Sequence, residues 1–204
     1  MCIRDSLTLT PDTQASIILE SAGLVSKLYK VDDRYTANYD PGFCATSASM
    51  LSSEGKRRRE TKVTYDRARN KANYLEKDLV KDNIVKVDEI DIPPCVHDIV
   101  GALLHLRTMK IDVGHSAQIP MSDGKKTAQV RVEAQAREDL KTTAGAFKTI
   151  RYEAFVFGGV IYQRPAKVWI WISDDPRRVP VQIKVRLQLA IGTITLSLEK
   201  EVRT

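Results

Sequence analysis

The stretch Val181-Gln182-Ile183-Lys184-Val185-Arg186-Leu187-Gln188-Leu189-Ala190-Ile191 decides the fold. Apolar side chains occupy every odd position, and polar side chains occupy all but one of the even positions. Successive side chains of a β-strand point to opposite faces, so this period of two indicates a strand with one dry and one wet face. Antiparallel sheets commonly leave one face in water, and the stretch therefore favours an antiparallel sheet.

The same alternation recurs along the chain. Over Lys126–Glu138, alanine and valine alternate with charged, amide or hydroxyl side chains. Asp123-Gly124 precedes this run and follows Ser116–Ser122, which predicts a hairpin because Asp-Gly suits a two-residue turn. Weaker alternation predicts further strands over Ala15–Glu20, Arg34–Tyr39, Ala45–Ser53, Arg57–Asp66 and Ala72–Lys77.

Two segments have helical character instead. Asp98–Met109 places Ile99, Leu103 and Leu106 on one side, and Asp98 is suited to cap its first turn. Gly23–Tyr29 predicts one or two helical turns. Strands and helices do not alternate in the order that a parallel sheet requires. We therefore expect a mainly β protein, with an antiparallel curved sheet or barrel of about ten strands and one or two short helices.

Length and composition point to an ordinary globular protein. The chain has 204 residues, of which 43% are hydrophobic and 28% charged. Its longest apolar stretch, Leu187–Leu198, is interrupted by polar residues and Gly192, so no membrane-spanning helix is expected. Residues 1–6, Met-Cys-Ile-Arg-Asp-Ser, resemble a translated sequencing-adapter remnant of environmental reading frames. We expect these six residues to be a non-native leader, and residues 7–204 to form a single barrel-like domain shortened at its amino-terminal end.

The charge pattern does not indicate a nucleic-acid-binding protein. The net charge is +6, but the basic run Lys56–Arg59 stands alone and is flanked by Glu54 and Glu60. A nucleic-acid-binding surface usually adds a stripe of stacking aromatic residues or a recognition helix, and the sequence has neither pattern. The run is interpreted as a solvated hairpin.

Cysteine and histidine spacing does not indicate a metal or catalytic site. The three cysteines form no CxxC pair, and the three histidines match no zinc or nucleophile motif. Cys44 and Cys95 each lie close to chain-turning prolines, so they can form a disulfide in an oxidising compartment or remain small buried apolar residues. We expect no catalytic residue, metal or cofactor.

A hydrolase site would require distant acid and base groups to converge. The groups in question are His97, His115, Asp174 and Asp175. Asp174-Asp175 precede a proline between two strand patterns, which is typical of a turn. A turn is therefore the preferred interpretation of this pair.

The segment Lys167–Ser173 is apolar on both faces. Val168, Ile170 and Ile172 share one face, and Trp169 and Trp171 share the other. Phe155 and Phe157 add aromatic side chains nearby in the sequence. A strand that is wet on neither face must be covered twice, by a core on one side and by a helix, a partner protein or an apolar ligand on the other. Trp169, Trp171, Phe155 and Phe157 are therefore the candidates for lining a ligand cavity.

The chain resembles a bacterial family known as domain of unknown function 3108. The resemblance runs from Gly23 to Lys200 and rests on the order and spacing of several segments. These are Gly23–Tyr29, Asp33–Tyr35, Val96–Asp98, Gly101–Leu103, Leu106-Arg107, Asp123–Lys125, Thr143–Thr149 and Val168–Pro180. It implies an exported, mostly β protein of the periplasm or outer envelope, with a fold similar to lipoprotein carriers and lipocalin-like proteins. It implies no established activity and no catalytic residues.

Together these patterns predict a non-catalytic envelope protein whose concave sheet holds an apolar or amphipathic molecule, such as a lipid. An alternative is a structural or assembly module that binds partner proteins through exposed strand edges or through Lys56–Arg59. A hydrolase is the third hypothesis.

Overall fold

The computed structural model describes residues 3–10, 13–21, 30–163, 165–187 and 193–199. Its contacts divide the chain into two compact units. The first comprises Met1–Leu103 and Pro120–Thr127, and the second comprises Leu104–Ile119 and Ala128–Thr204. The chain thus passes from one unit to the other three times. The assignment of residues 7–204 to one domain stays a prediction.

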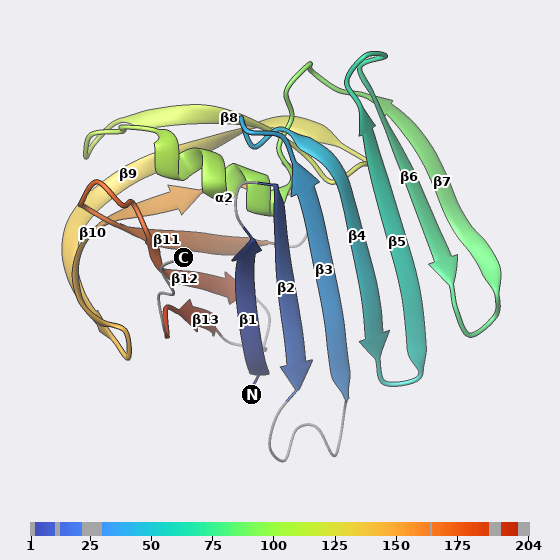
Figure 1. Cartoon of the computed structure of the whole chain (residues 1–204), viewed down its shortest axis with the longest axis horizontal. Coiled ribbons are helices and arrows are strands. Elements are labelled where there is room, and N and C mark those ends of the chain that lie inside the picture. The colour runs from blue at the N-terminus through green and yellow to red at the C-terminus, as the bar shows by residue number, and fades with distance from the viewer. Residues whose placement is uncertain (1–2, 11–12, 22–29, 164, 188–192, 200–204) are drawn as a thin grey trace. The chain divides into compact units, whose positions relative to one another are not determined.

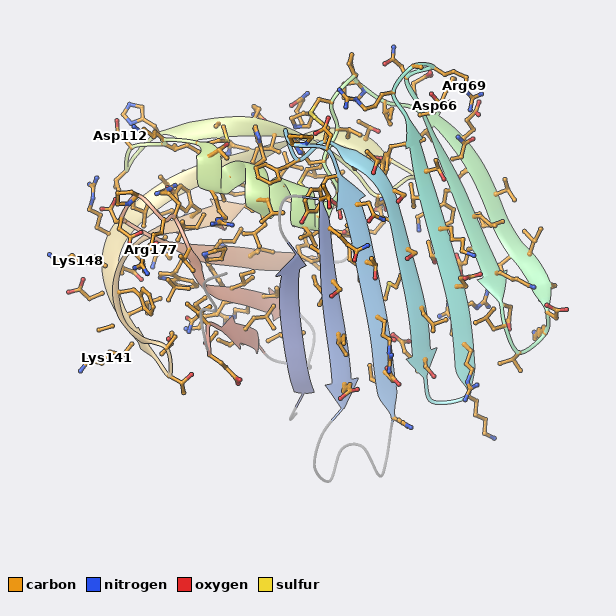
Figure 2. All side chains as sticks on the ribbon, in the orientation of Figure 1. Asp66, Arg69, Asp112, Lys141, Lys148 and Arg177 are labelled. Atoms are coloured by element: carbon orange, nitrogen blue, oxygen red, sulfur yellow. A yellow bond between two sulfur atoms is a disulfide. The ribbon has the colours of Figure 1, made fainter. Side chains whose placement is uncertain are left out.

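The first sheet contains seven antiparallel strands in chain order, which appear in blue to green in Figure 1. The strands are β1 (Ile3–Thr10), β2 (Gln14–Ser21), β3 (Val31–Tyr39), β4 (Ala45–Glu54), β5 (Arg57–Asp66), β6 (Lys71–Asp78) and β7 (Asn83–Asp91). Tight turns join β4 to β5 at Gly55 and β5 to β6 at residues 67–70. An ion pair of 2.7 Å between Asp66 and Arg69, both labelled in Figure 2, closes the second turn.

One face of the first sheet carries the core of its unit. The buried members are Ala45, Ala48, Val63, Tyr65, Ala72, Tyr74, Ile92 and Val96, and Tyr35 and Ile90 pack against them. In β5 and β6 the buried residues Val63, Tyr65, Ala72 and Tyr74 alternate with less buried polar residues, as the period of two requires. The hydroxyl of Tyr65 donates a hydrogen bond to the Ser122 carbonyl at 3.1 Å, which ties residues 120–127 to this sheet.

The second sheet contains six strands in the order β13-β12-β11-β10-β9-β8. They are β8 (Ser116–Ser122), β9 (Thr127–Thr142), β10 (Gly145–Ala154), β11 (Ala166–Ser173), β12 (Pro180–Leu187) and β13 (Thr193–Ser197). One face is apolar and buried, and includes Val130, Val132, Ala134, Ile150, Tyr152, Ile170, Ile172 and Val181. The adjacent position of β8 and β9 confirms the hairpin predicted from Asp123-Gly124. Gly124 has a φ of 84°, a conformation that favours glycine.

The helix α2 (Ile99–Thr108) agrees with the predicted helix over Asp98–Met109. Asp98 caps it, because its Oδ1 accepts the Gly101 N–H at 2.8 Å. The helix predicted over Gly23–Tyr29 lies outside the described residues. Among the described residues, no helix has both the length and the apolar character needed to cross a membrane.

The prediction of a mainly β, antiparallel protein is confirmed, but the barrel alternative is wrong. The described strands form two open sheets, of seven and six strands, and neither returns to its first strand. The alternation shows which face each side chain takes, but it does not show which strands pair, and closure depends on that pairing. β1 includes residues 3–6 of the expected non-native leader, and that expectation stays a prediction.

β1 and β10 were not predicted as strands, and neither was β7. Its side chains are mostly exposed, and apolar residues do not alternate cleanly with polar ones along it. The hydrophobic period that reveals half-buried strands is therefore absent from this edge strand.

Candidate functional site

Trp169 and Trp171 lie on the face of the second sheet opposite to its apolar face. In the strand register, Trp169 is opposite Glu153 and Lys184, while Trp171 is opposite Arg151 and Gln182. Cross-strand partners share a face, so charged and amide groups surround both indoles. We call this surface the tryptophan face. Its polar and aromatic members are Glu133, Gln135, Glu138, Thr149, Arg151, Glu153, Lys167, Trp169, Trp171, Ser173, Gln182, Lys184, Arg186, Thr193, Thr195 and Ser197.

Trp171 is held by a charged hydrogen-bond network. Its side chain is only 5% exposed, and its Nε1 donates to Glu138 Oε2 at 2.7 Å. The other oxygen of Glu138 accepts from Arg151 Nη1 at 2.5 Å. Because a buried indole N–H needs an acceptor, this bond fixes the ring on the sheet.

The network continues from Arg151 to Gln135 on β9, to Glu153 on β10 and to Lys167 on β11. Arg151 Nε donates to Gln135 Oε1 at 3.1 Å, and Gln135 Nε2 donates to Glu153 Oε2 at 2.5 Å. Lys167 Nζ then lies 3.6 Å from Glu153 Oε1. Gln135 takes part because a register shift between Arg151 and Tyr152 leaves it as an extra residue of β9. Such a bulge redirects a side chain, which explains why alternation alone does not predict the position of Gln135.

The side of the tryptophan face formed by β11 and β12 is basic. Lys184 Nζ lies 5.3 Å from the centre of the Trp171 ring, within cation–π range. Lys167 and Arg186 are directly opposite each other in the register. Like charges in that position destabilise a sheet, and Glu153 neutralises only one of them.

Gln182 contributes an unsatisfied acceptor to the same face. Its Nε2 donates to Ser197 Oγ at 3.0 Å, but in the described part of the chain its buried Oε1 accepts no hydrogen bond. Leaving a buried acceptor unsatisfied costs about 1–3 kcal/mol. A bound molecule that donates an O–H or N–H here would remove this cost.

The four aromatic cavity candidates lie in two kinds of environment. Trp169 and Trp171 share the tryptophan face. Phe155 follows β10, with the Arg131 guanidinium 4.2 Å from its ring centre. Phe157 pairs with Tyr162, at 5.3 Å between ring centres, in the segment after β10. The expectation that Lys167–Ser173 is apolar on both faces holds for the strand itself, whereas its neighbours on the tryptophan side are polar.

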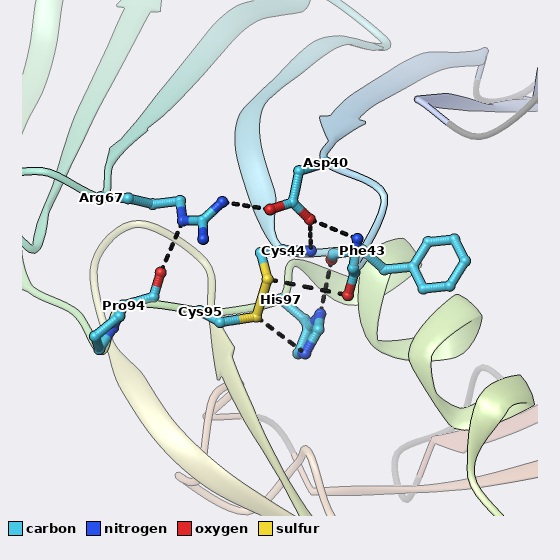
Figure 3. A network of polar contacts seen from close by, with 8 residues as sticks. Asp40, Phe43, Cys44, Arg67, Pro94, Cys95 and His97 are labelled. Atoms are coloured by element: carbon cyan, nitrogen blue, oxygen red, sulfur yellow. Dashed lines mark hydrogen bonds and ion pairs between the residues drawn. A yellow bond between two sulfur atoms is a disulfide. The ribbon is translucent and has the colours of Figure 1, made fainter.

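A second polar cluster lies in the first unit, around the disulfide that the structure forms between Cys44 and Cys95 (Figure 3). Their Cα atoms are 5.1 Å apart, across 51 residues of sequence. Arg67 donates to the Pro94 carbonyl at 2.9 Å and pairs with the Asp40 carboxylate, which also accepts the Cys44 N–H at 3.0 Å. The cluster thus joins three turns of the first unit.

His97 and Asp98 extend this cluster but face protein groups. Each is 1% exposed. His97 Nδ1 is hydrogen-bonded to the Phe43 carbonyl at 2.7 Å. Asp98 accepts the Tyr35 hydroxyl at 2.6 Å as well as the Gly101 N–H. These contacts support a structural role, and nothing in the sequence linked Tyr35 to Asp98.

Burial raises the pKa of the Asp98 carboxyl above its usual value, although the Tyr35 and Gly101 hydrogen bonds oppose this shift. The folded protein therefore binds a proton at Asp98 more readily than the unfolded chain does. Relative to an Asp98→Asn variant, we expect the free energy of unfolding of the wild type to rise as the pH falls through the folded-state pKa towards 4. Urea denaturation of both proteins between pH 4 and 7 measures this difference.

Asp175 provides a control of opposite sign. The hydrogen bond from Arg177 is the main cause that lowers the pKa of Asp175. The stability that Asp175 contributes is therefore present above pH 3.8 and should be lost only as the pH falls below that value. The wild type should keep a constant advantage over Asp175→Asn between pH 4 and 7 and lose it below pH 4. An Asp98 difference that stays constant with pH would contradict the expectation.

The acid and base groups of the hydrolase hypothesis belong to both units: His97 to the first, and His115, Asp174 and Asp175 to the second. Asp174 pairs with Arg137 at 3.0 Å. Asp175 accepts from Ser173 Oγ at 2.9 Å and from the Arg177 N–H at 3.0 Å, which is turn chemistry.

The basic run Lys56–Arg59 is partly neutralised. Arg59 lies 3.4 Å from Glu76 and 3.2 Å from Asp78, and Arg57 lies 3.7 Å from Glu76.

Within the described ranges, no group of three or more His, Cys, Asp or Glu side chains is arranged to hold a metal ion.

A comparison with protein families agrees with the family resemblance of the sequence. No curated protein matches the chain. The crystal structure of a DUF1089 family protein from Pseudomonas aeruginosa aligns with a TM-score of 0.38 and 12% identity, over 92% of this chain and 84% of that one. The family described as "Protein of unknown function (DUF3108)" matches residues 6–199. The chain therefore belongs to the DUF3108 family.

Proposed function

We propose that this protein is a non-catalytic binding protein of the bacterial envelope that holds an amphipathic anion on the tryptophan face. The observation that carries the proposal is the group of three cations, Lys167, Lys184 and Arg186, beside Trp169 on β11 and β12. On these two strands the tryptophan face presents no carboxylate. An anionic group placed between the cations would relieve their mutual repulsion.

The apolar part of the ligand would contact Trp169. This indole is only partly buried and lies opposite Lys184 in the register. An aromatic ring with a polar rim suits a molecule that is apolar at one end and charged at the other. Trp171 is less accessible and serves to position Lys184 through their cation–π contact.

The unsatisfied Oε1 of Gln182 adds a third requirement. A hydroxyl or amide N–H of the ligand would be bound by this acceptor next to the cations. Together the three features favour a lipid or glycolipid that carries a phosphate or carboxylate and a hydrogen-bond donor. The envelope location is supported by the disulfide, because disulfides persist in oxidising compartments.

The expected result is preferential binding of an anionic amphiphile, and charge reversal should weaken it. Dodecyl phosphate should change the tryptophan fluorescence and bind at least tenfold more tightly than dodecyl maltoside. Lys184→Glu should lower the affinity for dodecyl phosphate by at least about tenfold, because a reversed charge near the anion replaces attraction with repulsion. Fluorescence titration and calorimetry measure both effects.

A matched control separates this site from the general positive charge. Lys148, labelled in Figure 2, is exposed on β10 and does not belong to the tryptophan face. Lys148→Glu makes the same change of net charge and should leave the affinity within about twofold. Equal binding of the two amphiphiles, or equal effects of the two variants, would contradict the proposal. If inorganic phosphate binds as tightly as dodecyl phosphate, the apolar part of the ligand contributes nothing to binding. The site would then bind a simple anion, and the proposed amphiphilic ligand would be wrong.

A further inference from the structure

The exposed apolar side chains of the first unit gather on one hairpin. Seven large hydrophobic side chains are exposed among the described residues, and five of them lie between residues 79 and 87. These five are Leu79, Val80, Ile84, Val85 and Val87, with exposed fractions from 39% to 66%. Exposed apolar side chains that cluster on one hairpin mark an interaction surface more often than scattered ones do.

The same hairpin forms an edge of the first sheet. β7 pairs with β6 on one side, and in the described structure no strand pairs with its other side (Figure 1). The backbone N–H and C=O groups of β7 that point away from β6 thus have no strand partner in the described structure, and they lie beside exposed valines. Such an edge is a template for another strand.

The charges of β7 favour a second copy of β7 as the strand that pairs with this edge. Lys86 and Asp88 flank Val87 and already form an ion pair of 2.7 Å within the strand. If a second β7 pairs antiparallel with Val87 opposite Val87, each Lys86 is opposite the other copy's Asp88. Opposite charges stabilise directly opposed cross-strand positions, and this register forms two such pairs around a two-fold axis. In this register Glu89 is opposite Val85, but the centre is an apolar Val87–Val87 pair. A shift of one residue places Asp88 or Lys86 opposite Val87 and loses that central contact.

We propose that two copies of this chain associate through β7, antiparallel and centred on Val87, to extend the first sheet across a two-fold axis. The association covers the exposed apolar side chains of β7, Ile84, Val85 and Val87, and satisfies the outward backbone groups of the strand. It does not depend on the ligand proposed for the tryptophan face.

Charge exchange tests both the association and its register. Sedimentation equilibrium of the wild type should give a dimer. Lys86→Asp or Asp88→Lys alone should weaken the dimer by at least about tenfold, because each places like charges opposite one another. The double variant Lys86→Asp/Asp88→Lys should restore it, because the pairing is then reversed but complementary. A monomeric wild type, an open-ended polymer, or a double variant no tighter than the singles would overturn the proposal.

Cross-linking tests the two-fold position independently. Opposed Cβ atoms on neighbouring strands lie about 4.5–5.5 Å apart, close enough for a disulfide after small adjustments. In a Cys2→Ser background, Val87→Cys should form a covalent dimer under mild oxidation, whereas Val80→Cys should not. Val80 is a suitable control because it is 62% exposed but lies in the turn before β7. Equal cross-linking at both positions would contradict a dimer centred on Val87.

Discussion

Removal of the disulfide between Cys44 and Cys95 is expected to lower the free energy of unfolding by about 4 kcal/mol. The two cysteines are 51 residues apart, so the bond closes a long loop in the unfolded chain. Opening that loop returns conformational entropy to the unfolded state. Urea denaturation of the Cys44→Ala/Cys95→Ala variant against the oxidised wild type measures the loss.

Reduction provides the matched control for this prediction. Dithiothreitol should lower the stability of the wild type to that of the double variant, and it should leave the variant unchanged. The ion pair of Arg67 with Asp40 still connects two of the joined turns, so the first unit should keep its strands after reduction. A loss below about 1 kcal/mol would show that these contacts already restrain the loop, contrary to the chain-entropy argument.

The second large effect is expected for Gly101→Ala in the helix α2. A glycine-to-alanine change inside a helix normally stabilises a protein by about 1 kcal/mol. Here the added Cβ would lie 2.7 Å from the Phe43 carbonyl oxygen and 2.7 Å from Asp98 Oδ1. One contact involves backbone and the other involves the buried capping carboxylate, so neither neighbour can move away freely. We expect a loss of about 3 kcal/mol, the opposite sign from the usual helix effect.

Gly114→Ala is the control for this second prediction. Gly114 has a φ of 88°, but nothing lies within 4 Å of the position that its Cβ would take. Its substitution should cost only the backbone penalty, about 1–2 kcal/mol. Thermal or urea unfolding of both variants distinguishes a steric clash from a backbone preference. A neutral or stabilising Gly101→Ala would mean that α2 can move away from Phe43.

The sequence allowed most strands to be predicted, because half-buried strands leave a period of two. The runs over β5, β9 and β12 identify their buried faces directly, and Asp98 identifies the start of α2. β7 left no such period because most of its side chains are exposed. The division into two sheets was not predictable either, since strand pairing depends on contacts between residues far apart in the sequence.

The candidate site was predictable only in part, for a related reason. Trp169 and Trp171 stand out in the sequence as the second apolar face of β11. Their neighbours Glu138, Arg151 and Lys184 come from other strands, and only the register brings them together. The sequence of β11 alone therefore indicated an apolar surface. In the assembled sheet, charged side chains from the neighbouring strands surround the two tryptophans.

The threefold passage of the chain between its units has a consequence for biogenesis. Residues 120–127 complete the first unit, yet they are synthesised after residues 104–119, which belong to the second. The acceptors for the Tyr65 hydroxyl and for the His97 N–H, the carbonyls of Ser122 and Pro120, both come from this late segment. Cys95 emerges before that segment, so an oxidase that acts on the nascent polypeptide would meet both thiols while the core around them is still incomplete.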